Sequence, residues 1–351
     1  MLSELIISNV LMEMRTDISL KKYTTMQLGG KARFMAAAGN ADDVKNIYQE
    51  ASTKGLKVFV LGGGSNVITH DETFNGVVLL NRIKGFDVVS DDGENVVVRI
   101  GAGENWDEMV EKIVGMDLQG VEAMSGIPGT AGAAPVQNIG AYGQEIADTL
   151  VSLEAFDSKE GKVVTISAKD CHFSYRNSIF RSSQKGRYCI LSITLRLFRT
   201  QPKPPYYAAI QKYLTENDIR IVNLPVIRVA VLNIRAEKLP DPTQEPNSGS
   251  FFKNAIIEQW QLDELKKKYP DIPNYIMPDN TYKIPTGWLI EKAGLKGKTF
   301  HNIRVYEKNA LVLVNNGAAG YPDLAMAREK IVQKVYDKFH IQIQQEPLEL
   351  E

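Results

Sequence analysis

The sequence feature that most constrains this chain is a long run of very small residues, GIPGTAGAAPVQNIGAYG, at positions 126–143. A segment that packs into a core carries large apolar side chains at regular intervals, and this run has almost none. Small residues instead allow a large flat ligand to lie along the backbone, where Gln137, Asn138 and Tyr142 can hydrogen-bond its edges. The run therefore predicts a backbone-lined binding surface.

A second glycine-rich segment follows a predicted strand. The apolar run KVFVL at 57–61 has strand length, and it leads directly into Gly62, Gly63, Gly64, Ser65 and Asn66. Glycine lets the backbone approach a ligand closely, so the N–H groups of such a turn can converge on a phosphate. A triple glycine alone is more often a flexible turn, and the Gly-Lys-Ser/Thr of a P-loop is absent. The two glycine-rich segments together nevertheless indicate a dinucleotide such as FAD.

The remaining patterns divide the chain into two α+β units joined near residues 200–225. Apolar spacing and end signals predict helices at 40–55, 106–113, 225–238, 256–268 and 324–339, with a short one after Thr286. Strands or hairpins are predicted at 57–61, 96–100, 156–163, 189–197 and 310–314. The proline-rich run at 201–205 is typical of a linker.

Charge and cysteine usage exclude several functional classes. The formal net charge is −1, without the basic excess that binds nucleic acid or an anionic membrane surface. Residues 1–14 lack the basic start and clean apolar run of a signal peptide or membrane span. Cys171 and Cys189 form no disulfide framework, and the four histidines lack metal-ligand spacing. We expect a cytoplasmic protein with buried reduced thiols, no metal, and neither nucleic acid nor membrane as a partner.

Four runs in a specific order resemble the UDP-N-acetylenolpyruvoylglucosamine reductase family. They are GGGSN, IPGTAGAAPVQNIGAYG, YRNSIF at 175–180 and GSFFKN at 249–254, and the resemblance extends from about Ser19 to Pro347. The resemblance implies an α+β chain with an FAD-binding fold of the vanillyl-alcohol-oxidase type. It further implies the following division: two FAD-binding subdomains over 1–200 with a boundary near 77, a linker and tyrosine-bearing insert over 201–225, a C-terminal α+β substrate-binding domain over 226–345, and a tail over 346–351 that returns to the active site.

The resemblance also implies an activity. Family members are flavoprotein oxidoreductases that use noncovalently bound FAD and NADPH to reduce UDP-N-acetylglucosamine enolpyruvate to UDP-N-acetylmuramate, a peptidoglycan precursor. A monomer is expected. No histidine or cysteine stands in the two cofactor runs, which agrees with noncovalent binding. No local feature of the sequence distinguishes NADPH from NADH.

Three residues match the family's catalytic positions. Ser250 would donate a proton to the substrate carbon after hydride transfer, although a bare serine in such a loop is more often a cap or turn residue. Arg176 and Glu346 would stabilise the intermediate, with the arginine forking onto a carboxylate. By its position alone, Glu346 would be an exposed tail carboxylate. Leu348 stands where many family members carry an arginine.

The resemblance assigns binding roles to further positions. Those for the cofactor are Gly62, Gly63, Gly64, Ser65, Asn66, Gly126, Ile127, Pro128, Gly129, Gly132, Gln137, Asn138, Gly140, Ala141, Tyr142, Ile190 and Arg235. Those for the substrate are Tyr207, Lys238, Asn254, Tyr275 and Asn309, with Tyr206 as an alternative to Tyr207. Arg235 and Lys238 lie three residues apart on one predicted helix, hence on one face, which suits a diphosphate. Without the resemblance, both would be assigned to a solvated helix face.

Two other functions remain open at this point. An enzyme of the same FAD fold with another substrate, such as a sugar oxidase, would turn over rapidly with oxygen. A redox-inactive nucleotide-binding protein would be colourless when purified. The run GSFFKN and the C-terminal Glu-Pro pair argue against the first alternative, and Ser250, Arg176 and Glu346 argue against the second.

Overall fold

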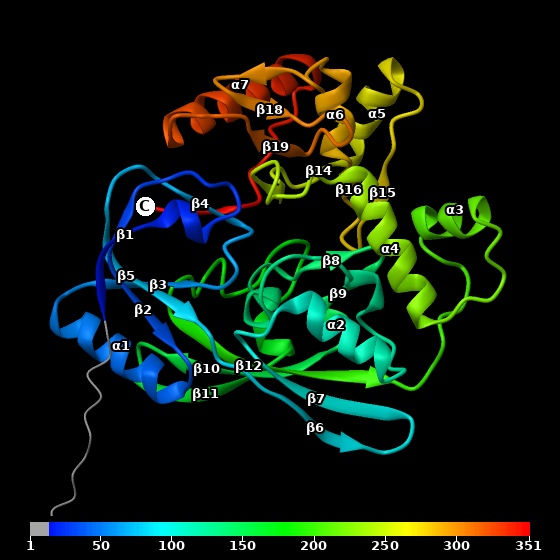
Figure 1. The fold of residues 1–351 in the computed structure, drawn as a ribbon. Coiled ribbons are helices and arrows are strands. Elements are labelled where there is room, and N and C mark those ends of the chain that lie inside the picture. Colours follow the sequence, from blue (N-terminus) through cyan, green and yellow to red (C-terminus); the bar gives the residue numbers. More distant parts are fainter. Residues whose placement is uncertain (1–13) are drawn as a thin grey trace, which may run out of the picture.

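The computed structural model describes residues 14–351 (Figure 1). The expectation that the first 14 residues carry neither signal peptide nor membrane span therefore lies almost wholly outside the described residues. Within 14–351, no helix is both long enough and apolar enough to cross a bilayer. The C-terminal region, coloured yellow to red, lies above two N-terminal layers coloured blue to green.

The first layer is a four-stranded sheet covered by one helix. Its strand order is β1 (Arg15–Ser19), β2 (Lys31–Ala38), β5 (Phe74–Asn81) and β3 (Lys57–Leu61), and only β1 runs antiparallel to its neighbour. The predicted helix at 40–55 is confirmed as α1 (Ala41–Thr53). Asn40 caps it by accepting a hydrogen bond from Asp43 N, and buried residues recur with helical spacing.

The second layer is a five-stranded antiparallel sheet with α2 (Trp106–Gly115) packed against it. Its order is β11 (Lys162–Ser167), β10 (Leu150–Asp157), β12 (Tyr188–Phe198), β7 (Asn95–Gly101) and β6 (Phe86–Asp91). The predictions at 96–100, 156–163 and 189–197 are confirmed as parts of this sheet. The change from one sheet to the next falls between Asn81 and Phe86. Residue 77, near which we expected the boundary, lies inside β5.

The connection between the N-terminal layers and the C-terminal region is helical. Residues 201–225, expected as linker and insert, contain α3 (Ala208–Glu216), which packs on α4 (Leu224–Lys238). The sequence offered little signal for α3, because only Ile210 and Leu214 are buried on it. The predicted helix at 225–238 is confirmed, and it also packs against α2 (Figure 1).

The C-terminal region contains two small antiparallel sheets and three helices. One sheet comprises β13 (Asn247–Ser250), β19 (Val312–Asn315), β18 (Ile303–Val305) and β17 (Thr299–Phe300), and the other comprises β14 (Ala255–Ile257), β16 (Tyr282–Ile284) and β15 (Tyr275–Ile276). The helices are α5 (Gln259–Lys268), α6 (Thr286–Lys292) and α7 (Tyr321–Phe339). The predicted start of a helix at Ile256 was wrong. Residues 255–257 pair with β16 as a strand, and a capping box at Glu258 begins the helix.

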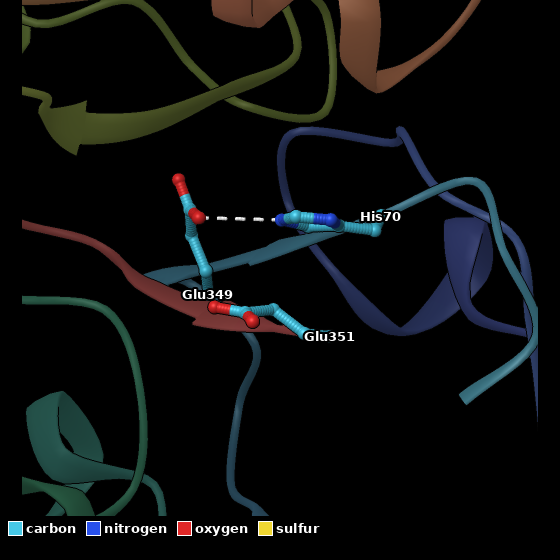
Figure 2. Close-up of side chains that lie close together, drawn as sticks. All are labelled: His70, Glu349 and Glu351. Carbon is cyan, nitrogen blue, oxygen red and sulfur yellow. Dashed lines mark hydrogen bonds and ion pairs between the residues drawn. The ribbon is translucent and has the colours of Figure 1, made fainter. Parts of the chain in front are cut away.

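The C-terminal tail returns to the first layer. Strand β20 (Leu348–Leu350) pairs in parallel with β4 (Val67–Thr69), directly after the glycine-rich turn. Figure 2 shows His70 and Glu349 pointing toward each other, with His70 Nε2 3.2 Å from Glu349 Oε2 and Glu351 nearby. Arg328 of α7 donates to the other oxygen of Glu349 at 2.5 Å. The tail therefore ties the C-terminal region to the first layer.

Candidate active site

The two glycine-rich segments meet backbone to backbone. A Cβ added to Gly63 would lie 2.8 Å from the Cα of Gly129, too close for any other residue type. Ser65 Oγ donates to Pro128 O at 3.1 Å across the same contact. Small residues in both segments therefore allow a close approach that the sequence could only suggest.

A largely apolar cavity in two adjoining parts lies along this contact. One part is lined by most of the predicted cofactor residues: Gly62, Gly63, Gly64, Ser65, Asn66, Ile127, Pro128, Gly129 and Gln137, together with Trp106, Ile139 and Leu348. The adjoining part is lined by Gly132, Ile190, Ala102, Phe180 and Tyr188. The two parts share Phe59, Val60, Gly62, Thr130, Ala133, Val136 and Leu348. A two-part cavity lined by glycine backbone suits a flat ligand such as the FAD expected from the sequence.

The other predicted cofactor residues lie beside this cavity. The Asn138 side chain is buried and engaged within the protein, bonding Glu145 at 2.7 Å, Ser174 O at 3.2 Å and Ala147 N at 3.2 Å. Asn138 therefore stabilises this part of the small-residue run through hydrogen bonds inside the protein. Residues Gly140 and Ala141 form the short strand β8, paired with β9 (Gln144–Glu145).

Gly64 has a different reason for being glycine than we expected. Its φ is +67°, and a Cβ there would lie 1.9 Å from the carbonyl oxygen of Tyr23. A side chain at position 64 would thus clash with the protein's own backbone, whereas we expected it to clash with the cofactor. At Gly129, with φ +120°, a Cβ meets only Ser65 Oγ at 3.2 Å. Of the two glycines, Gly129 is the better probe of the cofactor cavity.

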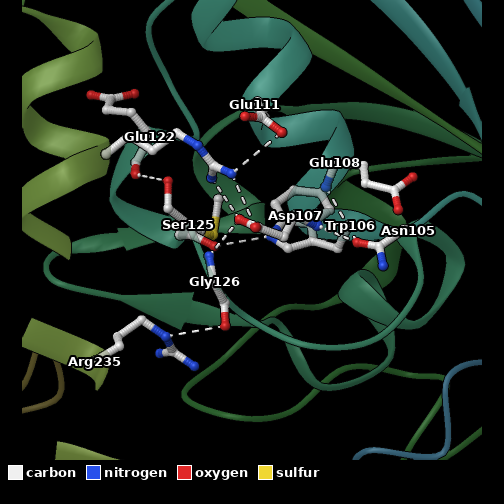
Figure 3. A network of polar contacts seen from close by, with 11 residues as sticks. Asn105, Trp106, Asp107, Glu108, Glu111, Glu122, Ser125, Gly126 and Arg235 are labelled. Carbon is white, nitrogen blue, oxygen red and sulfur yellow. Dashed lines mark hydrogen bonds and ion pairs between the residues drawn. The ribbon is translucent and has the colours of Figure 1, made fainter. Parts of the chain in front are cut away.

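Helix α4 holds the start of the small-residue run in place (Figure 3). Asp107 in the first turn of α2 accepts the Gly126 N–H at 2.5 Å and a bidentate pair of hydrogen bonds from Arg228, at 2.6 and 3.0 Å. Arg235, two helical turns after Arg228, donates through Nε to Gly126 O at 3.1 Å. Burial lowers the pKa of Arg235, against the opposing effect of Tyr142 and Asp107. Lys238 is exposed at the end of α4.

Arg176 sits at the tip of a tight turn. Ser174 and Asn177 exchange two backbone hydrogen bonds, at 3.1 and 3.0 Å, and Arg176 between them has φ +52°. A non-glycine residue in this conformation is strained, which is common at functional sites. Arg176 donates to Gly140 O at 2.6 Å, and its Nε lies 3.5 Å from Glu346 Oε1.

Glu346 is a buried residue, unlike an exposed tail carboxylate. Its N–H donates to Phe251 O at 2.8 Å, which places it beside Ser250 at the end of β13. Ser250 itself is half-buried. Burial raises the pKa of Glu346, while the positive charges of Arg176, Arg181 and Lys253 oppose that rise. Arg176 and Glu346 thus meet, and the backbone of Glu346 pairs with the residue that follows Ser250, so three distant segments come together here.

Two of the neighbouring cations were not predicted from the sequence. Arg181 donates to Gln137 Oε1 at 3.0 Å and to Glu346 O at 2.7 Å. Lys253 is half-buried, and burial followed by the charge of Arg181 lowers its pKa. Arg181 directly follows the run YRNSIF at 175–180, and Lys253 lies within the run GSFFKN at 249–254, which was the available signal.

Tyrosines surround the approach to this site. The Tyr207 ring packs edge-on against that of Tyr142 at 5.7 Å, and Tyr142 has φ +48° at the tip of the β8–β9 hairpin. Burial, with a smaller effect from Tyr275, raises the pKa of Tyr207. Tyr206 instead packs in the α3–α4 cluster and donates to Pro202 O. Of the two alternatives, Tyr207 is therefore the one on the site side.

The remaining predicted substrate residues lie on the C-terminal region. Asn254 N donates to the Tyr175 hydroxyl at 3.3 Å, and its side-chain oxygen accepts the Thr286 N–H at 3.1 Å. Asn309 accepts the Leu311 N–H through its side chain at 3.1 Å. An unpredicted cation also lies here: Lys283 Nζ is 5.1 Å from the centre of the Tyr175 ring and 5.7 Å from that of Tyr275.

Known proteins match both halves of the chain. Residues 32–167 match an FAD binding domain, and residues 241–349 match the C-terminal domain of UDP-N-acetylenolpyruvoylglucosamine reductase. The reductase of that name from Ralstonia nicotianae is 40% identical over 333 residues, covering 94% of this chain and 97% of the relative. The one from Flavobacterium johnsoniae is 37% identical over 336 residues, covering 95% and 99%.

Solved structures share the fold. A UDP-N-acetylenolpyruvylglucosamine reductase from Thermus caldophilus has a TM-score of 0.67 at 22% identity, covering 97% of this chain and all of that one. The 6-hydroxy-D-nicotine oxidase from Arthrobacter nicotinovorans has a TM-score of 0.52 at 13% identity, covering 95% and 88%. The predicted fold class and the FAD cofactor are confirmed. The sequence similarity extends over nearly the whole chain, and the chain belongs to the UDP-N-acetylenolpyruvoylglucosamine reductase family.

Proposed function

We propose that this protein is an NADPH-dependent flavoenzyme that reduces UDP-N-acetylglucosamine enolpyruvate to UDP-N-acetylmuramate. The observation that carries the proposal is the contact of Arg176 with Glu346, whose side chain accepts from the cavity residue Gln137 and whose N–H donates to Phe251 O, next to Ser250 in the chain. Arg176, Glu346 and Ser250 come from three segments far apart in the sequence. Relatives at 37–40% identity that bear the reductase name support the same substrate.

The chemistry assigns a task to each of these side chains. The residues of the two glycine-rich segments would hold FAD, and the bound cofactor would supply the hydride chemistry between NADPH and the enol-ether carbon distal to oxygen. The neighbouring carbon then carries negative charge next to a carboxylate, and Ser250 would supply the proton that this carbon needs. Arg176 would hold the substrate carboxylate and take up part of that charge. Glu346, buried beside Arg176, would orient the guanidinium and favour a charged partner there.

The two ligands would use one approach to the flavin. NADPH and the UDP-sugar both carry a diphosphate, and Lys238 and Arg235 lie on one face of α4. Tyr207, Tyr275, Asn254 and Asn309 would contact the UDP-sugar. A shared diphosphate site requires the ligands to bind in turn.

We also propose that the protein works as a monomer in the cytoplasm. Cys171 and Cys189 are both buried free thiols, and burial raises the pKa of each to about 12. Such thiols are unreactive and suit a reducing compartment. Gel filtration with light scattering tests the monomer, and a dimer mass would contradict it.

The test is a visible spectrum under anaerobic conditions. NADPH should bleach the flavin band of the purified protein, and the enolpyruvyl UDP-sugar should then restore it. Rapid restoration by oxygen in place of the sugar would favour an oxidase. A colourless protein that does not take up FAD would refute flavin chemistry altogether.

A further inference from the structure

Arg181 lies where three segments of the site meet. Its turn is held by backbone hydrogen bonds from Arg181 N to Ser178 O and from Ser182 N to Ile179 O, at 3.3 and 3.2 Å. Ser178 is fully buried and donates to Val136 O at 2.6 Å, which fastens this turn to the small-residue run. The position of the guanidinium is therefore set by the fold on both sides.

Two hydrogen bonds from Arg181 reach different parts of the site. One nitrogen donates to Gln137 Oε1 at 3.0 Å, and the other donates to the backbone carbonyl of Glu346 at 2.7 Å. A guanidinium presents its N–H groups in a rigid planar fork, so one side chain holds both acceptors at a set spacing. The cavity wall and the C-terminal tail are joined through this residue.

The same contact determines how the Gln137 amide is turned. Arginine has only donors, so the Gln137 atom that faces it must be the oxygen. Asn66 donates to that oxygen as well. With its oxygen held from two sides, the amide directs its NH2 group toward Glu346 Oε1, 3.4 Å away. Glu346 Oε1 thus accepts a hydrogen bond from Gln137 and forms an ion pair with Arg176, whose Nε is 3.5 Å away.

We propose that Arg181 is a positioning residue, which orients the Gln137 amide and the backbone of Glu346 so that the carboxylate faces Arg176. The inference rests on the proposed function for its kinetic test only. Besides its hydrogen bonds, the charge of Arg181 opposes the burial that raises the pKa of Glu346. The effect of losing the positive charge can therefore be distinguished from the effect of losing the paired hydrogen bonds of the guanidinium.

Two variants separate these effects. Arg181→Met should slow flavin reoxidation by the enolpyruvyl substrate by about 10- to 100-fold, the usual effect of one lost charged hydrogen bond. It should also move the acid limb of that step's pH profile to higher pH, because Glu346 loses a stabilising cation. Arg181→Lys keeps the charge but loses the paired guanidinium donors. The rate of flavin reoxidation should therefore fall, while the acid limb of its pH profile should stay in place.

A readout independent of activity is hydrogen exchange at the tail. The amides of Glu346 and Leu348 donate to Phe251 O at 2.8 Å and to Asn66 O at 3.0 Å. In the FAD-loaded protein, Arg181→Met should speed exchange of both amides. Arg181→Lys should speed it less, since it still reaches one acceptor.

Arg187→Met is the matched control. Arg187 lies in the same connecting segment and makes a bidentate pair with Asp157 of β10, at 2.6 and 2.9 Å. Loss of Arg187 should lower stability without shifting the acid limb of the pH profile and without changing the hydrogen-exchange rates of the Glu346 and Leu348 amides. The positioning role would be overturned if Arg181→Met left both the acid limb of the pH profile and the exchange of the tail amides unchanged. Equal changes of both in Arg187→Met would overturn it as well. A wild-type protein that does not reduce the enolpyruvyl sugar would refute the proposed function alone, because the exchange comparison still stands.

Discussion

Replacing Arg228 by methionine removes one partner of the ion pair that braces the start of the small-residue run. The Arg228 side chain is 10% exposed and Asp107 is 31% exposed, so the change leaves a half-buried carboxylate without its cation. Removing one partner of a fully buried pair costs about 3–5 kcal/mol. Because solvent reaches part of Asp107, we expect the free energy of unfolding to fall by about 2–3 kcal/mol.

Two further variants isolate the pair. Asp107→Asn in the Arg228→Met background removes the unpaired charge and keeps an oxygen for the Gly126 N–H, so it should recover about 1–2 kcal/mol. Glu111→Gln is the matched control. Glu111 lies 3.9 Å from Arg228 but is 72% exposed, and its loss should cost less than about 0.5 kcal/mol.

The pH dependence gives an independent check. Burial of Asp107 opposes its ionisation, but hydrogen bonds from Arg228 and Gly126 outweigh that and hold its pKa below the usual 3.8. A lowered carboxyl pKa gives stability that is present above 3.8 and is lost as pH falls through the folded value. In Arg228→Met, burial is no longer opposed by this cation and raises the pKa of Asp107, so the stability difference should be constant near neutral pH and shrink as pH falls through that raised pKa.

Urea unfolding followed by tryptophan fluorescence measures these differences. Titration of the apoprotein with FAD measures the consequence for the cofactor, and we expect Arg228→Met to weaken FAD binding by about tenfold, since the Gly126 loop is less ordered. An Arg228→Met variant no less stable than Glu111→Gln would refute the reasoning. A stability difference that persists unchanged at pH 3 would refute the role of Asp107.

Three other outcomes are expected. Ser250→Ala should leave flavin reduction by NADPH near normal and slow reoxidation by the substrate by about 10²–10⁴-fold in stopped flow; equal slowing of both steps would contradict a proton-donor role. Gly129→Val should lose flavin and some stability, because valine is strained at φ +120°, whereas Gly64→Val should destabilise the fold more, because its Cβ would also lie 1.9 Å from Tyr23 O. Full FAD occupancy in Gly129→Val would contradict our placement of the cofactor. Lys238→Ala should weaken NADPH and the UDP-sugar alike, and Tyr207→Phe should weaken mainly the UDP-sugar, by about one to two decades in affinity. Simultaneous binding of both ligands to the oxidised protein would contradict a shared site.

The sequence by itself determined the local elements and the family. Helices such as α1 and α4 carry their own caps and apolar spacing, so their bounds could be predicted within a few residues. The glycine-rich runs among the four predicted the class of cofactor, because a binding surface lined by backbone requires small residues whatever the surrounding fold. Short elements failed where local signal was weak: the strand at Ala255–Ile257 has only three residues and was taken for part of a helix.

Only the tertiary structure decided how distant segments meet. The position of Glu346 in the chain favours an exposed tail carboxylate, and only the family resemblance implies that the tail returns to the active site. The burial of Glu346 beside Arg176 depends on the tail pairing with β4. Leu348 lines the cofactor cavity in that pairing. The role inferred for Arg181 likewise rests on contacts with residues 44 and 165 positions away. Such contacts form only when the layers close on one another, and no local pattern encodes them.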